Sequence, residues 1–145
     1  MSNAKVSNAK TLVIGGINVD ITGRSTDEVV LGTSNPGTIS VSPGGAGRNI
    51  AEGLARLGEP VALVGSVGGD ELAKSVVRRT AQAGVDVGAV STLEADTGTN
   101  TNTYLSVVDS SGTMRVAVSD MAGAERTDQT VVGRAFARFS GIRFV

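Results

Sequence analysis

Residues 43–65 read PGGAGRNIAEGLARLGEPVALVG and predict a turn, a helix and a buried strand in succession. The apolar residues recur at helical spacing and are Ile50, Leu54 and Leu57. Gly58 is typical of a helix C-terminus, and Pro60 prevents the helix from continuing. The apolar run 61–64 then predicts a strand.

The same alternation continues on both sides of this stretch. Residues 11–17 and 85–90 are short apolar runs that predict strands, and a further strand is expected to begin at residue 142. Residues 70–84 and 127–139 are amphipathic and predict helices. Because strands alternate with helices, we expect an α/β fold with a doubly wound, mostly parallel sheet.

Two segments do not fit this alternation. Residues 19–42 contain half-exposed strands around a polar loop, and residues 101–120 contain two strands joined by Asp109-Ser110-Ser111-Gly112. Turn chemistry of this kind predicts a hairpin. We expect the two segments to pair as a small β lid beside the main sheet.

Composition limits the possible chemistry and partners. The chain has 145 residues, a net charge of −1, no cysteine and no histidine, so we expect no metal site and no nucleic-acid partner. No apolar run is long enough to span a membrane, and residues 1–10 are polar and small, as in an expression tag or disordered tail. We therefore expect a cytoplasmic protein with no membrane contact.

The first candidate site follows Gly15-Gly16 at the end of the first strand. Asn18 and Asp20 point the same way if the backbone there is extended. Open α/β sheets bind ligands at this end of their strands. A carboxylate and an amide on one face suit a pair of vicinal hydroxyls, and the alternative is a turn in which both side chains cap the local backbone.

The second candidate site is the glycine-rich turn that opens the helix at residue 47. Gly44 and Gly45 allow a ligand to approach the backbone closely, and a helix start leaves unpaired N–H groups. Asn49 lies in the first turn, where its amide could meet a sugar hydroxyl. The alternative is a plain strand–turn–helix connection. A dinucleotide fingerprint is excluded because Ile50 stands where its third glycine is needed, and a Gly-Lys-Ser/Thr phosphate loop is absent.

Together these motifs resemble the ribokinase-like (PfkB) carbohydrate kinases over residues 11–145. The resemblance rests on Asn18-x-Asp20, on residues 44–51 with the glycines that follow them, and on residues 65–70. Within that family, four segments look most like pseudouridine kinases: residues 34–37, 48–52, 103–105 and 119–121.

The resemblance implies an ATP-dependent kinase that phosphorylates a ribosyl hydroxyl, with pseudouridine as the substrate and with ATP and Mg²⁺ as cofactors. It also implies a homodimer formed through the lid. The substrate-binding residues that it implies are Asn18, Asp20, Gly44, Gly45, Asn49, Thr103 and Asp120, of which the last two would face the base.

The sequence departs from the family pattern in one respect. The Gly-Ala-Gly-Asp motif that supplies the family's catalytic base does not occur, and the last expected strand stops at Val145. We therefore expect residues 11–145 to be the N-terminal, substrate-binding part of a longer kinase, without catalytic residues and inactive alone. The alternatives are a non-catalytic fragment that binds ribosyl groups or dimerises and, disfavoured by the broken fingerprint, a nucleotide-dependent oxidoreductase.

Overall fold

The computed structural model describes residues 8–93 and 98–145. A parallel sheet forms the centre of the fold, with the strand order β1 (Thr11–Ile14), β4 (Val61–Val67) and β5 (Asp86–Thr92). On the free side of β1, Thr11 also forms a parallel bridge with Phe144. The parallel strands expected from the sequence are confirmed, although the residues after 142 contribute this single bridge instead of a strand.

Strand β4 shows how the core is built, because all seven of its residues are buried. Alternate side chains point to opposite faces of the sheet. Val61 and Leu63 pack into one apolar cluster with Val76 of the helix α2 (Glu71–Gln82). Ala62 and Val64 pack into a second cluster on the other face.

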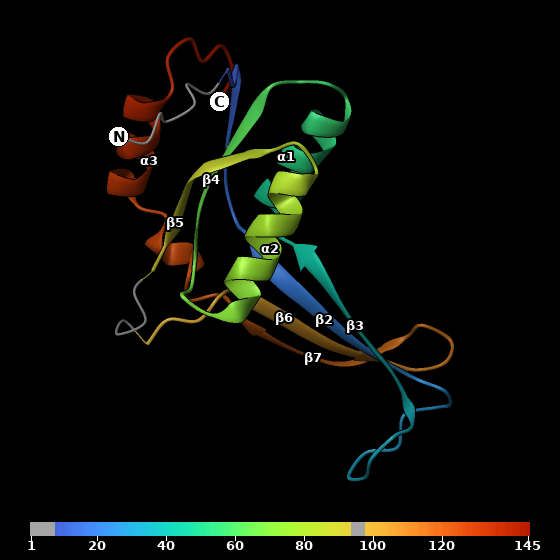
Figure 1. Cartoon of the computed structure of the whole chain (residues 1–145). Helices are drawn as coiled ribbons and strands as arrows, with labels where there is room; N and C mark the ends of the chain where they lie inside the picture. The colour runs from blue at the N-terminus through green and yellow to red at the C-terminus, as the bar shows by residue number, and fades with distance from the viewer. Residues whose placement is uncertain (1–7, 94–97) are drawn as a thin grey trace.

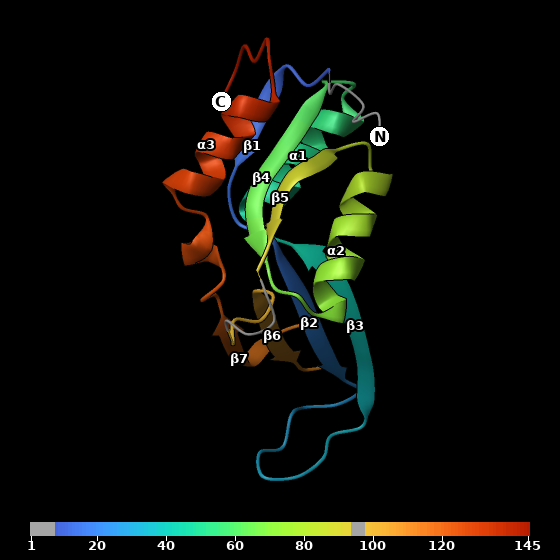
Figure 2. The same ribbon diagram turned by 60° about the vertical axis from the view of Figure 1, so that its left-hand side comes forward.

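Helices cover both faces of this sheet (Figure 2). Helices α1 (Ala46–Arg56) and α2 lie on one face, and α3 (Gln129–Arg138) lies on the other, where Ala135 is buried. The helix ends agree with the sequence: Gly58 adopts a φ of 85°, and the Asp70 carboxylate accepts a hydrogen bond from the Ala73 N–H. The expected doubly wound α/β fold is therefore confirmed.

A second sheet projects from the end of the first (Figure 1). Its strand order is β3 (Gly37–Gly44), β2 (Asn18–Ser25), β6 (Thr103–Val108) and β7 (Met114–Asp120). Strands β2 and β6 run parallel, and the other two pairs are antiparallel. The two segments outside the alternation thus pair as expected, although β3 runs through Pro43 and Gly44, where the sequence predicted a break.

The register of the second sheet separates an apolar face from a polar one. The rows of paired residues put eight apolar side chains on one face: Val19, Ile21, Ile39, Val41, Leu105, Val107, Val116 and Val118. The opposite face carries Asn18, Asp20, Thr22, Ser40, Ser42, Tyr104, Ser106 and Ser119. On the polar face, the Thr22 and Ser106 hydroxyls are hydrogen-bonded at 3.2 Å.

The end of this apolar face nearest the main sheet belongs to the protein core, in which Val19 is buried. Farther out, Ile39 and Val118 are 78% and 63% exposed. In residues 8–93 and 98–145, no helix is both long and apolar enough to cross a bilayer.

Candidate functional site

Asn18 and Asp20 lie at the start of β2, immediately after the first buried strand of the main sheet. They flank the buried Val19 and share the polar face of the second sheet, where both are half-buried. The Asn18 Nδ2 donates a hydrogen bond to the Asp20 Oδ1 at 2.6 Å. The Asp20 Oδ2 has no hydrogen-bond partner among the described residues, so it is available as an acceptor.

The glycine pair at the end of β3 lies directly against these two side chains. Asn18 pairs with Gly44 in the strand register, and a Cβ added to Gly44 would lie 2.4 Å from the Asp20 Oδ2 and 2.6 Å from the Asn18 Nδ2. Gly45 has a φ of 99°, and a Cβ there would lie 2.3 Å from the Gly16 carbonyl oxygen. The structure therefore brings together four of the predicted residues, and the glycines leave the space that the polar side chains occupy.

The same glycine pair begins α1. Gly45 is the N-cap residue, and no side chain caps the helix there. The backbone oxygen of Gly45 accepts from the Asn49 N–H at 2.8 Å, and the Gly16 oxygen accepts from the Arg48 N–H at 3.2 Å. These contacts place the first turn of α1 beside Asn18, so its N-terminal partial positive charge lies near the Asp20 carboxylate.

Asn49 is exposed on the first turn of α1. Its Oδ1 accepts a hydrogen bond from the Arg48 Nη1 at 3.0 Å, and its Nδ2 donates to no described residue. The side chain makes no hydrogen bond to Asp20. Asn49 is connected to the glycine pair through its backbone, by the hydrogen bond from its N–H to the Gly45 oxygen.

Thr103 and Asp120, two further residues predicted to bind the substrate, do not join the Asn18–Asp20 pair. In the register of the second sheet, Thr103 pairs with Val19 on one side and with Asp120 on the other. All three therefore belong to the apolar face, opposite to the face of Asn18 and Asp20. The Thr103 hydroxyl donates to the Thr101 oxygen at 2.9 Å, and the Asp120 Oδ1 accepts from the Ala122 N–H at 3.5 Å.

Asp70 does more than cap α2. Its two carboxylate oxygens accept from the Thr101 N–H at 2.8 Å and from the Thr101 hydroxyl at 2.7 Å. The Thr101 Oγ1 in turn accepts from the Gly68 N–H at 3.1 Å. Burial raises the pKa of Asp70, but the hydrogen bonds from Thr101 and Ala73 outweigh it, so the pKa lies below its usual value.

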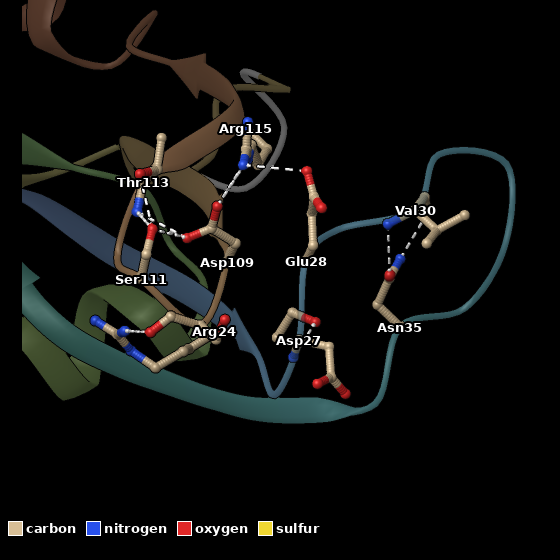
Figure 3. Close-up of polar contacts among 11 residues, drawn as sticks. Arg24, Asp27, Glu28, Val30, Asn35, Asp109, Ser111, Thr113 and Arg115 are labelled. Atoms are coloured by element: carbon tan, nitrogen blue, oxygen red, sulfur yellow. Dashed lines mark hydrogen bonds and ion pairs between the residues drawn. The ribbon is translucent and has the colours of Figure 1, made fainter.

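Asp109 organises the hairpin turn at the far end of the second sheet (Figure 3). The Ser111 hydroxyl and the Thr113 N–H donate to its carboxylate at 2.6 and 3.0 Å, and the Arg115 Nη2 lies 2.7 Å from it. These contacts, that of Ser111 first, lower the pKa of Asp109 to about 2 against the opposing effect of desolvation. On its other side, Arg115 lies 3.7 Å from the Glu28 carboxylate.

No group of three or more acidic, histidine or cysteine side chains that could hold a metal ion is found in residues 8–93 and 98–145. The 145-residue sequence also contains no Gly-Lys-Ser/Thr phosphate loop. What the site offers is a carboxylate acceptor, amide groups and a glycine-lined helix start, which are the groups that hold a polyhydroxylated ligand.

Comparisons with known sequences and with solved structures lead to the same family of enzymes. Residues 8–143 match the model of the pfkB family of carbohydrate kinases. The chain is 42% identical over 110 residues to the pseudouridine kinase of Escherichia coli, a match that covers 76% of this chain and 34% of that protein. The chain thus spans about a third of the length of this curated relative.

Two solved structures show the same fold. A carbohydrate kinase from Agrobacterium tumefaciens superposes with a TM-score of 0.73 at 30% identity, over 90% of this chain and 43% of that one. The Arabidopsis thaliana ribokinase complexed with ribose and ATP superposes with a TM-score of 0.67 at 25% identity, over 80% of this chain and 37% of that one. From its match to the family model over most of its length, the chain belongs to the pfkB family of carbohydrate kinases.

Proposed function

We propose that this chain is the substrate-binding part of an ATP-dependent kinase that phosphorylates a hydroxyl of a ribosyl group. The observation that carries the proposal is the convergence of Asn18, Asp20, Gly44 and Gly45 at the start of α1. A carboxylate oxygen without a partner accepts a hydrogen bond from a hydroxyl, and the uncapped helix start donates to oxygen atoms. Asn49, on the same helix turn, adds a side-chain donor.

In this proposal the residues of the chain hold and orient the sugar. Asp20 accepts a hydrogen bond from one ribosyl hydroxyl through Oδ2, while Asn18 holds Oδ1 in place. The glycines keep side chains out of the space beside the carboxylate. Because the acceptor is already fixed, less entropy is lost when the ribosyl hydroxyl is oriented toward the phosphoryl group that it receives. Thr103 and Asp120 are not included, because the register puts them on the other face of the sheet.

Pseudouridine is the substrate that we propose among ribosyl compounds. The support is the 42% identity to the pseudouridine kinase of E. coli, which exceeds the 31% identity to the guanosine-inosine kinase of Exiguobacterium acetylicum. The latter relative also acts on a ribosyl nucleoside by its name, so the ribosyl group is the common element.

We further propose that phosphotransfer needs ATP and Mg²⁺ held by residues outside this sequence, and that the 145-residue chain is inactive alone. The support is that the Gly-Ala-Gly-Asp motif, which the family resemblance implies for the catalytic base, is absent from the sequence. The shared length of about a third with the E. coli enzyme agrees with this view.

A phosphotransfer assay tests the proposal. The 145-residue chain and a version extended past Val145 along its coding sequence are each incubated with ATP, Mg²⁺ and pseudouridine. We expect nucleoside phosphate from the longer polypeptide and none from the shorter one. The absence of product from the longer one with pseudouridine and with ribose would refute the kinase proposal.

The apolar face of the second sheet supports a homodimer as the assembly. Five apolar side chains on that face are exposed: Ile39, Val41, Leu105, Val116 and Val118. A contiguous exposed apolar patch is typical of an interaction surface. We propose that a second copy of this chain packs its own sheet on this face, so the sheet both borders the sugar site and forms the dimer.

The same surface favours a second candidate function, in which the chain serves only to dimerise or to bind ribosyl groups. This candidate predicts that the version continued past Val145 also lacks kinase activity while the chain still self-associates. The phosphotransfer assay therefore separates the two candidates.

A further inference from the structure

Arg48 is a charged residue on the side of α1 that faces α2. The residue is buried, with 8% exposure, whereas Asn49 and Ile50 beside it are exposed. The Arg48 Nε donates to the Thr80 Oγ1 at 3.3 Å, and its Nη2 pairs with the Glu52 carboxylate. A guanidinium group is rigid and planar, so partners on both helices fix its orientation.

The other side of the same guanidinium meets the proposed sugar site. The Arg48 Nη1 donates to the Asn49 Oδ1 at 3.0 Å and reaches the Pro43 oxygen at 3.5 Å. A guanidinium can only donate, and the two ends of an asparagine amide differ, one being an acceptor and the other a donor. The contact therefore selects the orientation in which Oδ1 faces Arg48 and Nδ2 is left to donate elsewhere.

In both Asp20 and Asn49, a neighbouring side chain thus occupies one polar atom and leaves the other for a ligand. Asn18 occupies one oxygen of Asp20 and leaves the other as an acceptor, and Arg48 occupies the oxygen of Asn49 and leaves the amide nitrogen as a donor. An acceptor and a donor together match two neighbouring hydroxyl groups, of which one donates and the other accepts.

We propose that Arg48 is a positioning residue that fixes the Asn49 amide so that its Nδ2 donates to a ribosyl oxygen. This inference rests on the proposed function of the site. Arginine is required because one flat group must reach α2, Glu52 and Asn49 at once, whereas a lysine ammonium is a point charge at the end of a flexible stem.

A double-mutant cycle tests the inference through the dissociation constant for pseudouridine, measured by isothermal titration calorimetry on the 145-residue chain. Arg48→Lys and Asn49→Ala are each expected to weaken binding about tenfold, because each removes a hydrogen bond to the ligand or its support. Since both act through one amide, the double variant is expected to bind as weakly as Asn49→Ala alone. Effects that multiply would overturn the inference.

Arg56→Lys is the matched control. Arg56 donates to the same Glu52 carboxylate at 2.8 Å through Nε, but it is 71% exposed and does not contact Asn49. We expect this variant to bind pseudouridine as the unchanged chain does. An equal loss in the two lysine variants would show that the guanidinium contacts with Glu52, and not the Asn49 amide, control binding, and would overturn the inference.

The side-chain NH₂ signals of Asn49 in a ¹H–¹⁵N spectrum separate this inference from the proposed function. Arg48→Lys is expected to shift these signals without any ligand, and Arg56→Lys is expected to leave them unchanged. If Arg48→Lys does not fold, Thr80→Val removes only the hydroxyl that anchors Nε and must produce the same shift.

Unshifted signals refute the positioning role. Shifted signals in a chain that binds neither pseudouridine nor ribose refute the proposed function and the ligand contact of Asn49, but leave its orientation by Arg48 intact.

Discussion

The Asn18 Nδ2 lies 2.6 Å from the Asp20 Oδ1, so one oxygen of this carboxylate is held by its own strand while the other has no partner among the described residues. The pair lies where the chain leaves the main sheet and enters the second one. A side chain fixed in this way is ready to bind before any ligand arrives, which reduces the ordering that binding requires.

Replacement of the carboxylate tests its role in binding. We expect Asp20→Asn to weaken the binding of pseudouridine by about tenfold or more, because a hydrogen bond to a charged acceptor is lost. Since Asp20 is half-buried and outside the core, the unfolding temperature is expected to change little. Titration calorimetry and thermal unfolding measure the two effects. Unchanged affinity would remove Asp20 from the site.

Gly44 is expected to tolerate no side chain. The Cβ of Gly44→Ala would lie 2.4 Å from the Asp20 Oδ2, so the alanine must displace the carboxylate or the strand, and we expect binding to be lost. Gly53→Ala is the matched control on α1, where no atom lies within 4 Å of the added Cβ. This change is expected to stabilise the chain by up to about 1 kcal/mol and to leave binding unaltered. Equal affinities of the two variants would contradict the prediction.

The bond between Asp70 and Thr101 is expected to stabilise the junction of the two sheets. Thr101→Val keeps the shape of the side chain but removes the hydroxyl that donates to Asp70 and accepts from Gly68. Because Thr101 is fully buried, we expect the free energy of unfolding to fall by about 1–3 kcal/mol. Urea denaturation measures it. Thr92→Val, at an exposed threonine at the end of β5, is the control, and we expect it to change the free energy of unfolding little.

Acid is expected to weaken the hairpin through Asp109. Its pKa is lowered from 3.8 to about 2, so its contribution to stability is present above about pH 4 and is lost as the pH falls through about 2. Asp109→Asn removes the titrating group. The difference in unfolding free energy between the two proteins should therefore be largest near neutral pH and shrink toward pH 2. A difference that does not change with pH would contradict this.

Self-association is expected to depend on the apolar face of the second sheet. Val118→Lys places a charge on that face, and we expect the dimer to weaken at least tenfold, because an unpaired buried charge is unfavourable. Val30→Lys is the control, since Val30 is similarly exposed, at 59% against 63%, but lies in the loop between β2 and β3. Sedimentation velocity distinguishes the variants. A monomeric unchanged chain would contradict the proposed dimer.

Local sequence signals predicted most of the fold. Apolar runs identified the parallel strands, and Gly58 and Asp70 marked helix ends correctly. Both features depend on residues near in sequence. The partner of Asp70 could not be found in this way, because Thr101 follows it by 31 positions.

The candidate site was predicted in part. Asn18 and Asp20 share a face because they lie two apart on one strand, and sequence alone gives that spacing. The placement of Thr103 and Asp120 depends on the register of β6 against β2, which nothing in the local sequence determines. Arg48 was included only as part of a motif. Its position one residue before Asn49 was the available signal, but its burial against Thr80 needed the structure.

The binding of a ribosyl group at the start of α1 is tested most directly by a ¹H–¹⁵N titration of the chain with pseudouridine. We expect the largest shifts at the backbone amides of Asn18, Asp20, Gly44 and Asn49. Shifts confined to another surface, such as the groove that Gly88 of β5 lines with α3, would contradict the proposed site, as would a spectrum that the ligand leaves unchanged.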